Sequence, residues 1–326
     1  MRAVAFTQTG GPEVLHVMDV ADPDVGPGEV RIRVTVSGVN FRDVGVRKYG
    51  RNEGSQVPQP VVTGIEAAGV VESLGDGVAH LSVGQRVATI CPGGGYGDLL
   101  VIPANRAIAL PDEISDETAG TFGMTGFTAW HLLHTAAKVQ PGDTVIVHAA
   151  AGGVGIMLSQ LASRCGVTVI GTVGSDEKME TAKTFGADHV INYQRENFAE
   201  AAKAITGGRG VDFIFDAVGA STCADDVKAL RVLGKLVSFG RASGPPQLGM
   251  EDLQGKSLQW GYFGVFHAWN QPELWQRGVA NLVPLIASGA VNPYITATYP
   301  WEQAPEAHRR LENRETQGKL ALLHGR

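Results

Sequence analysis

The sequence predicts an α/β protein that combines a β-rich part with a doubly wound, parallel sheet of six strands. Three observations predict this class. The chain has 326 residues, which is long for one domain. Its first hundred residues hold short apolar segments separated by glycine-rich turns. Between residues 144 and 263, by contrast, apolar strand-like runs alternate with helical patterns, and the first run leads into a glycine-rich loop.

The N-terminal part is expected to consist of short antiparallel strands. In EVRIRVTV, Val30, Ile32, Val34 and Val36 share one face, and this period of two indicates a half-buried strand. The opening MRAVAF is expected to be a strand and not a targeting segment. Such strands are typical of a compact barrel or sandwich. The further expected strands are VVTGIEAAGVVESLG, GQRVATI, GDLLVIP and AIALP.

A long helix is expected next, over residues 116–137, with Ser115 or Asp116 as its N-cap. It contains His131 and His134, whose spacing would suit one metal ion. Neither a glutamate between them nor a third ligand is evident, so we interpret them as two residues of a helix face.

The alternating region then predicts the parallel sheet, because its strands are apolar on both faces. The tail adds two helices, ELWQRGVANLVPLIASG and APEAHRRLENR, and a last strand, KLALL, that is expected to return to the β-rich part. The expected sheet strands are TVIVHAA, VTVIGTV, HVINY, VDFIFDAVG, KLVSFG and SLQWGYF, and the helices between them are GIMLSQLASRCG, DEKMETAKTFG, ENFAEAAKAITGG and ADDVKALRVLG.

The loop HAAAGGVG, residues 148–155, predicts a dinucleotide site. Gly152 and Gly155 occupy the second and third glycine positions of the G-x-G-x-x-G pattern, and Ala150 stands at the first, which alanine tolerates if its φ stays negative. The start of the following helix would face the phosphates with its N–H groups.

The end of the second sheet strand favours NADPH over NADH. An NAD site usually has a carboxylate there, whereas this chain has Val173, Gly174 and Ser175. Ser175 offers a hydroxyl and Lys178 a cation to a 2′-phosphate. Asp176 and Glu177 lie close and oppose this interpretation, although both can point outward from a helix start.

Composition excludes several classes of protein. The net charge is −6 without a basic run, which argues against a nucleic-acid or anionic-membrane surface. No apolar run reaches the roughly 18 residues of a membrane span. The three cysteines lack C-x-x-C spacing, which argues against disulfides or cysteine zinc sites and fits a cytoplasmic protein.

The motifs HAAAGGVG, VIGTVGSDEK, VINY, GVDFIFDAVG, GKLVSFG and TQGKLAL resemble the zinc-free quinone oxidoreductase (zeta-crystallin-like) branch of the medium-chain dehydrogenase/reductases. The resemblance covers essentially the whole chain. It implies a GroES-like catalytic domain, residues 1–123 and 267–326, around a Rossmann domain, residues 124–266. It also implies NADPH as the cofactor and a homodimer joined through the last sheet strand, SLQWGYF.

The resemblance also implies roles for individual residues. Asn40 and Thr128 match residues beside the nicotinamide. Family members often carry a tyrosine after the GVN segment; Gly45 stands there in this chain, and Tyr49, at a different spacing, is the candidate to take that role. The implied or predicted cofactor-binding residues are Ala151, Gly152, Gly153, Val154, Gly155, Gly174, Ser175, Lys178, Tyr193, Ala217, Val218, Gly219, Phe239, Gly240 and Arg314.

A metal is not expected, because Asn40 and Ile65 stand where zinc-dependent relatives carry ligands. Electron-poor substrates need less stabilisation of developing charge than simple ketones do. Asn40, Thr128, Tyr49 and Arg42 are candidate donors, and Asp43 is interpreted as a helix N-cap in preference to a proton relay.

The sequence leaves three functions open. The first is hydride transfer from NADPH to a quinone. The second is reduction of an activated C=C bond in an enone, 2-alkenal or enoyl thioester, because GVNFRDV also resembles enoyl reductase domains. The third is a non-enzymatic role, either as an NADPH-binding structural protein of the lens type or as an RNA-binding protein. The acidic charge balance argues against RNA binding.

Overall fold

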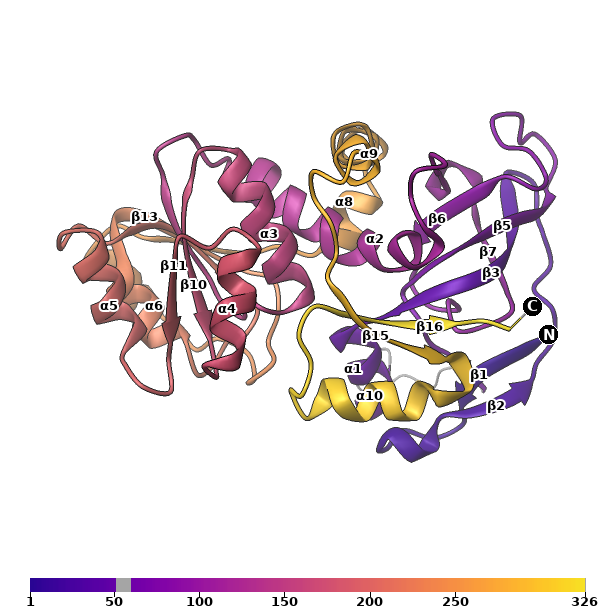
Figure 1. The fold of residues 1–326 in the computed structure, drawn as a ribbon, viewed down its shortest axis with the longest axis horizontal. Helices are drawn as coiled ribbons and strands as arrows, with labels where there is room; N and C mark the ends of the chain where they lie inside the picture. The colour runs from indigo at the N-terminus through magenta and orange to yellow at the C-terminus, as the bar shows by residue number, and fades with distance from the viewer. Residues whose placement is uncertain (51–59, 326) are drawn as a thin grey trace. The chain divides into compact units, whose positions relative to one another are not determined.

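The structure is a computed structural model that describes residues 1–50 and 60–325 (Figure 1). The chain divides into two compact units. The first contains residues 1–125 and 279–326, and the second contains residues 126–278. The units therefore meet at residues 125/126 and 278/279. The domain boundaries expected from the sequence are 123/124 and 266/267.

Two sheets form the first unit. One has the strand order β2-β1-β4, and the other has the order β15-β16-β3-β5-β6-β8 with β7 also paired to β3. The strands are β1 (Arg2–Phe6), β2 (His16–Asp19), β3 (Glu29–Val39), β4 (Val61–Val62), β5 (Glu66–Leu74), β6 (Arg86–Ile90), β7 (Leu99–Pro103), β8 (Ile108–Ala109), β15 (Ile295–Pro300) and β16 (Lys319–Leu323).

The last strand joins the N-terminal strands, as the sequence predicts. β16 pairs antiparallel with β3, with Leu320 opposite Val39 (Figure 1). The alternation in β3 has the expected result, because Val30, Ile32, Val34 and Val36 are all buried. Segments far apart in the chain therefore share one core.

Helices α1 (Phe41–Tyr49) and α10 (Ala304–Glu312) belong to the first unit, and helices α2 (Asp116–His131) and α9 (Pro272–Ala287) cross the unit boundaries. The Oγ of Ser115 accepts a hydrogen bond from the N–H of Thr118 at 3.2 Å, so Ser115 is the N-cap of α2. The expected helix is not regular to its end, because Leu132–Ala137 forms a π-helix that stops at Lys138 with a φ of 61°.

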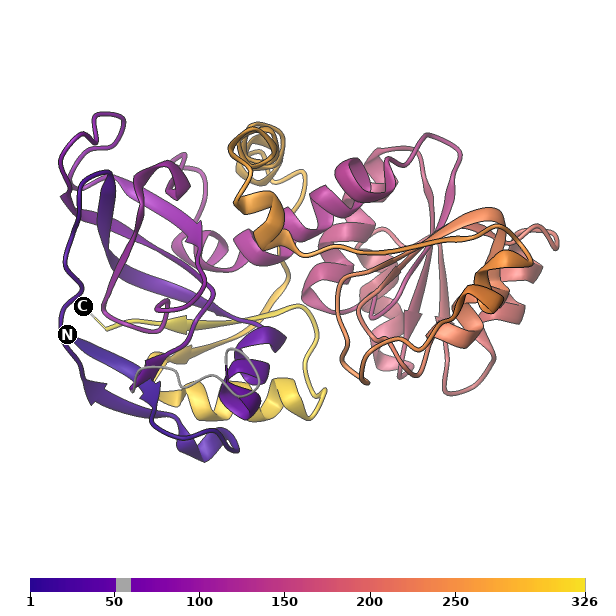
Figure 2. The ribbon, with the colours of Figure 1, turned by 180° about the vertical axis from the view of Figure 1, so that it is seen from behind.

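The second unit contains the predicted six-stranded sheet, and all of its pairings are parallel. The order β11-β10-β9-β12-β13-β14 is typical of a dinucleotide-binding fold. Helices α3 and α4 cover one face and α5 and α6 the other (Figures 1 and 2). The elements are β9 (Thr144–Val147), α3 (Gly153–Arg164), β10 (Thr168–Val173), α4 (Glu177–Thr184), β11 (His189–Asn192), α5 (Phe198–Ile205), β12 (Val211–Asp216), α6 (Cys223–Ala229), β13 (Leu230–Ser238), α7 (Met250–Gln254), β14 (Gln259–Tyr262) and α8 (Val265–Trp269).

One sequence prediction in this unit is wrong. The expected helix ADDVKALRVLG continues to Gly234, whereas α6 ends at Ala229 and β13 begins at Leu230. Leu230 pairs with Val211 across a bulge, and Leu233 has a φ of 62°. Sheet pairing therefore overrides the helical spacing of Leu230 and Leu233. No helix among the described residues is long and apolar enough to cross a membrane.

Candidate active site

The glycine loop lies between β9 and α3, as the sequence predicts. Gly152 is the N-cap of α3, and no described side chain accepts a hydrogen bond from the N–H groups that begin this helix. These N–H groups have no partner within the helix, so they can face an anion. The left-handed residue of the loop is Ala149, with a φ of 52°, and Ala150 is buried without a positive φ.

Gly152 and Gly155, the two glycines that match the pattern, have different steric surroundings. A Cβ on Gly155 would lie 2.3 Å from the carbonyl oxygen of Ala149, so this position needs glycine for close packing of helix on strand. A Cβ on Gly152 would lie 3.1 Å from the same oxygen, a tight contact but a milder one than at Gly155. The close approach at Gly155 is the helix–strand packing predicted for the third glycine, and the role predicted for Gly152 stays a prediction.

His148, the first residue of the loop, is buried and bonded on both ring nitrogens. Its Nδ1 lies 2.7 Å from the Oγ1 of Thr172, and its Nε2 lies 2.7 Å from the Oδ1 of Asp226. Burial lowers the pKa of His148, but the Asp226 carboxylate outweighs burial and raises this pKa above its ordinary value. The hydrogen bond between His148 and Asp226 connects the loop to α6.

A tyrosine lies against Gly174, the residue that follows β10. A Cβ on Gly174 would lie 2.5 Å from the hydroxyl oxygen of Tyr193, whose ring is 42% exposed. Ser175 follows, and its carbonyl accepts a hydrogen bond from the N–H of Lys178 at 3.2 Å. The structure thus brings together four of the residues expected on the adenosine side.

Asp176, which opposed the choice of NADPH in the sequence, is paired in the structure. Its carboxylate accepts a hydrogen bond from the Nδ2 of Asn192 at 2.8 Å and forms an ion pair with Arg195. Both partners come from β11 or the turn after it. The negative charge at the end of β10 is therefore partly compensated by an arginine that the sequence patterns did not identify.

The ends of β12 and β13 also meet. The buried carboxylate of Asp216 accepts the N–H groups of Val218 at 2.7 Å and Gly219 at 2.9 Å. A Cβ on Gly240 would lie 2.6 Å from the carbonyl oxygen of Ala217, and the N–H of Phe239 donates to the carbonyl of Asp216. Backbone contacts thus bring these predicted cofactor residues together at the carboxyl end of the sheet, where doubly wound folds bind ligands.

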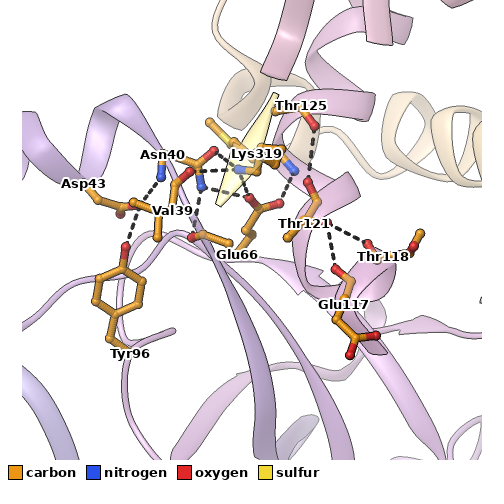
Figure 3. Close-up of polar contacts among 12 residues, drawn as sticks. Val39, Asn40, Asp43, Glu66, Tyr96, Glu117, Thr118, Thr121, Thr125 and Lys319 are labelled. Carbon is orange, nitrogen blue, oxygen red and sulfur yellow. Dashed lines mark hydrogen bonds and ion pairs between the residues drawn. The ribbon is translucent and has the colours of Figure 1, made fainter. Parts of the chain in front are cut away.

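A second cluster lies in the first unit, at the end of β3 (Figure 3). Asn40 follows β3, Glu66 begins β5 and Lys319 begins β16, so the pairing of both neighbours with β3 brings the three side chains together. The Nδ2 of Asn40 lies 2.9 Å from the Oε1 of Glu66, and the Nζ of Lys319 lies 2.5 Å from that oxygen. All three residues are buried.

The interpretation of Asp43 as an N-cap is wrong. Asn40 is the N-cap of α1, and Asp43 lies in the first turn, where its Oδ2 accepts the N–H of Asn40 at 2.9 Å. The spacing allows this because residues three apart at a helix start face each other. Burial raises the pKa of Asp43 to about 7, against the opposing effect of the Asn40 N–H.

Buried polar groups extend this cluster. The hydroxyl of Tyr96 lies 3.4 Å from the Oδ2 of Asp43 (Figure 3). It also lies 3.1 Å from the Nε2 of His308. Burial lowers the pKa of His308 to about 3, so its ring is neutral at physiological pH. Burial also raises the pKa of Tyr96 well above its ordinary value.

The remaining predicted residues lie elsewhere. Tyr49 is 65% exposed and ends α1, a helix of nine residues, so its backbone lies roughly 13 Å along the helix from Asn40. Arg42 is exposed in the first turn of that helix. Thr128 is buried in the part of α2 that belongs to the second unit. Arg314 follows α10 with a φ of 61°.

Sequence reasoning did not identify Glu66, Lys319, Tyr96 or His308 as site residues. Two of them stand in segments that it did consider, Glu66 in GIE and Lys319 in TQGKLAL. The available signal was a charged residue at the start of an apolar strand pattern. Such a residue is expected to be buried, and charges are rarely buried without a partner.

Among residues 1–50 and 60–325, three potential metal-ligating side chains come close together in one group, His148, Asp216 and Asp226. His131 and His134 belong to no such group in this part of the chain. Burial lowers the pKa of His131 to about 4, and its Nδ1 lies 2.9 Å from the Oγ1 of Thr135. His131 is buried in α2, and His134 lies in the π-helix that follows it.

Comparison with known proteins gives matches over nearly the whole chain. Residues 26–112 match the alcohol dehydrogenase GroES-like domain, and residues 153–280 match the zinc-binding dehydrogenase family. A 2-haloacrylate reductase from a Burkholderia species is 37% identical, with 98% of each chain covered. Quinone oxidoreductase 1 of Escherichia coli is 35% identical, also with 98% of each chain covered.

Solved structures agree with these matches. The crystal structure of Escherichia coli quinone oxidoreductase complexed with NADPH has a TM-score of 0.93 and 34% identity, and the match covers 99% of this chain and 100% of that one. The GroES-like part and the six-stranded Rossmann sheet expected from the sequence are therefore both confirmed. The chain belongs to the zinc-free quinone oxidoreductase branch of the medium-chain dehydrogenase/reductases.

Proposed function

We propose that the protein is an NADPH-dependent, metal-independent oxidoreductase that reduces a quinone. The observation that carries this proposal is the full-length similarity to quinone oxidoreductases, one of them solved with NADPH, together with a glycine loop and strand ends suited to a dinucleotide. When bound, NADPH would supply a hydride that bonds to the conjugated quinone, and the remote quinone oxygen would take up the electron pair and then a proton from water.

The nucleotide would be held by the second unit. The N–H groups at the start of α3, beside Gly152, would bind the pyrophosphate. Ser175 and Lys178 would bind the 2′-phosphate, and Tyr193 would cover the adenosine side. The pairing of Asp176 with Arg195 supports NADPH because it offsets one of the two nearby carboxylates that would repel this phosphate.

The substrate oxygen would be bound by a hydrogen bond from the Asn40 amide, and Thr128 stays a candidate donor on the evidence of the sequence alone. A quinone delocalises the incoming charge onto that oxygen, so one or two preorganised hydrogen bonds suffice without a metal ion. Asn40 is well suited because its side chain is held between Glu66 and Lys319. Tyr49 remains a candidate only if its exposed ring closes over a bound substrate.

Reduction of an activated C=C bond is the second candidate. Its support is the 37% identity with a 2-haloacrylate reductase over 98% of the chain. Such a substrate also delocalises hydride charge onto a remote oxygen, so the same donors would serve.

We further propose that residues 1–123 and 267–326 form the catalytic domain, that residues 124–266 form the cofactor domain, and that the protein works as a cytoplasmic homodimer. The few scattered cysteines fit a reducing compartment. Strand β14 ends the sheet order and carries Trp260 and Tyr262, 39% and 67% exposed, which suits pairing with a second copy.

The test is a substrate panel with the purified chain. Binding of NADPH and NADH is titrated by nucleotide fluorescence, and NADPH oxidation is followed with p-benzoquinone, a naphthoquinone, 2-chloroacrylate and a cyclic enone. Quinone turnover with the alkenes left intact supports the first candidate, and alkene reduction supports the second. Binding of NADPH without any turnover would favour a non-enzymatic protein, and tenfold tighter NADH binding would contradict the cofactor assignment.

A further inference from the structure

The ammonium group of Lys319 is buried and uses all of its donors. The side chain is 3% exposed, and its Nζ lies 2.5 Å from the Oε1 of Glu66, 2.8 Å from the Oδ1 of Asn40 and 3.0 Å from the carbonyl oxygen of Val39. An ammonium has three protons, so this one is saturated by protein groups. Lys319 is therefore held in one place and oriented toward the end of β3.

Glu66 completes the arrangement from the other side. Its side chain is 1% exposed, its Oε1 accepts from Lys319 and from the Nδ2 of Asn40, and its Oε2 accepts the N–H of Met124 at 2.8 Å (Figure 3). Both carboxylate oxygens thus have protein partners.

These two charges decide how the amide of Asn40 is oriented. Its oxygen faces the cation and its nitrogen faces the carboxylate, so rotation of the amide by half a turn would place like polarities together. One N–H is taken by Glu66, and the other has only a long contact of 3.4 Å with the carbonyl oxygen of Gly38. The second N–H is the donor that remains for a ligand.

We infer that Lys319 and Glu66 are positioning residues for the reaction, which aim and polarise the Asn40 amide so that its weakly bonded N–H binds the oxygen of the substrate. This inference rests on the proposed function. A cation on the amide oxygen withdraws electron density from the amide and strengthens its N–H as a donor. A donor held in advance stabilises developing oxygen charge without reorganisation.

The experiment is a double-mutant cycle on kcat with the full-length protein. Asn40→Ala removes the donor, and kcat is expected to fall by about 10²-fold. Lys319→Met removes the cation, and kcat is expected to fall by roughly tenfold or more while the KM for NADPH stays unchanged. In the double variant, Lys319→Met is expected to add little to the effect of Asn40→Ala, because Lys319 acts through that amide.

Two further variants separate positioning from stability. Glu66→Gln combined with Lys319→Met leaves no uncompensated buried charge, and it replaces the single variant if that one does not fold. Lys256→Met is the matched control, because Lys256 also donates to three acceptors, the carbonyls of Val227, Lys228 and Leu230, in the second unit. We expect that control to lower the melting temperature and leave kcat of the folded protein unchanged.

The outcomes are distinct. Equal fold losses from Lys319→Met with and without Asn40, in an active enzyme, would overturn the positioning role and leave the proposed function standing. A loss that disappears in the Asn40→Ala background supports it. Absence of turnover by the wild-type chain across the substrate panel would overturn the proposed function, and the positioning role with it.

Discussion

Asp43 combines full burial with an ionisable group beside Asn40, and burial raises the pKa of its carboxyl to about 7 from an ordinary 3.8. As pH rises through this interval, the unfolded chain loses the proton while the folded protein keeps it. The free energy of unfolding should therefore fall with rising pH, by on the order of a few kcal/mol, and the loss should be complete above the folded pKa.

Asp43→Asn tests this at the same position, because an amide oxygen can still accept the N–H of Asn40. Urea unfolding at a series of pH values should show a smaller decline of stability with pH for the variant than for the wild type. Asp112→Asn, at an exposed site, serves as the control. Parallel curves for the wild type and Asp43→Asn would show that folding does not raise the pKa of Asp43.

Arg195 should influence the choice of cofactor because it pairs with Asp176 near Ser175. Arg195→Ala leaves that carboxylate less compensated, so the Kd for NADPH should rise about two- to fivefold while the Kd for NADH changes little. Adding Asp176→Asn should restore the wild-type ratio of the Kd for NADPH to the Kd for NADH. Fluorescence titrations of both nucleotides measure it, with Lys228→Ala, which removes an exposed pair with Asp225, as the control. An unchanged ratio of the two Kd values would exclude this role.

At the scale of an element, two glycines in the loop from β9 to α3 have different expected roles, Gly152 in nucleotide binding and Gly155 in packing. Gly155→Ala would place a Cβ 2.3 Å from the carbonyl oxygen of Ala149, so we expect a loss of about 1–3 kcal/mol in unfolding free energy. Gly152→Ala meets its nearest atom at 3.1 Å, a milder clash, so its loss of stability should be smaller than that of Gly155→Ala. Its Cβ should instead hinder the pyrophosphate and raise the Kd for NADPH roughly tenfold, the equivalent of 1.4 kcal/mol.

Thermal unfolding and NADPH titration of both variants provide the check, and each variant is the control for the other. If Gly152→Ala lost stability and kept its NADPH affinity, the assignment of the two glycines would be reversed.

The elements also show where sequence patterns succeed and fail. β9 and α3 are predicted well, because a continuous apolar run and a glycine loop are local signals. β13 is predicted to start too late, because Leu230 and Leu233 have helical spacing while only the pairing of Leu230 with Val211 makes this segment a strand. The π-helix at Leu132–Ala137 has no composition that distinguishes it from α-helix.

For the whole molecule, the free edge of the six-stranded sheet is the feature with a testable consequence. β14 is bonded to β13 alone among the described strands, and Tyr262 on it is 67% exposed. Tyr262→Lys places a charge on the proposed dimer contact, so the mass by light scattering should fall to that of one chain. Val83→Lys, at an apolar site of 65% exposure in the first unit, should leave the mass unchanged. A wild-type chain that is already monomeric would contradict the proposed homodimer.

The pattern along the chain was sufficient for the fold class, the glycine loop and the strand ends that follow it, because each depends on residues within one turn or one strand of each other. Folding alone brings Lys319 to Glu66 and Asn40, which lie 253 and 279 residues away in sequence. The same holds for the burial of Asp43 and for the pairing of Arg195 with Asp176. These contacts depend on which strands become neighbours and in what register, and no local periodicity encodes that choice.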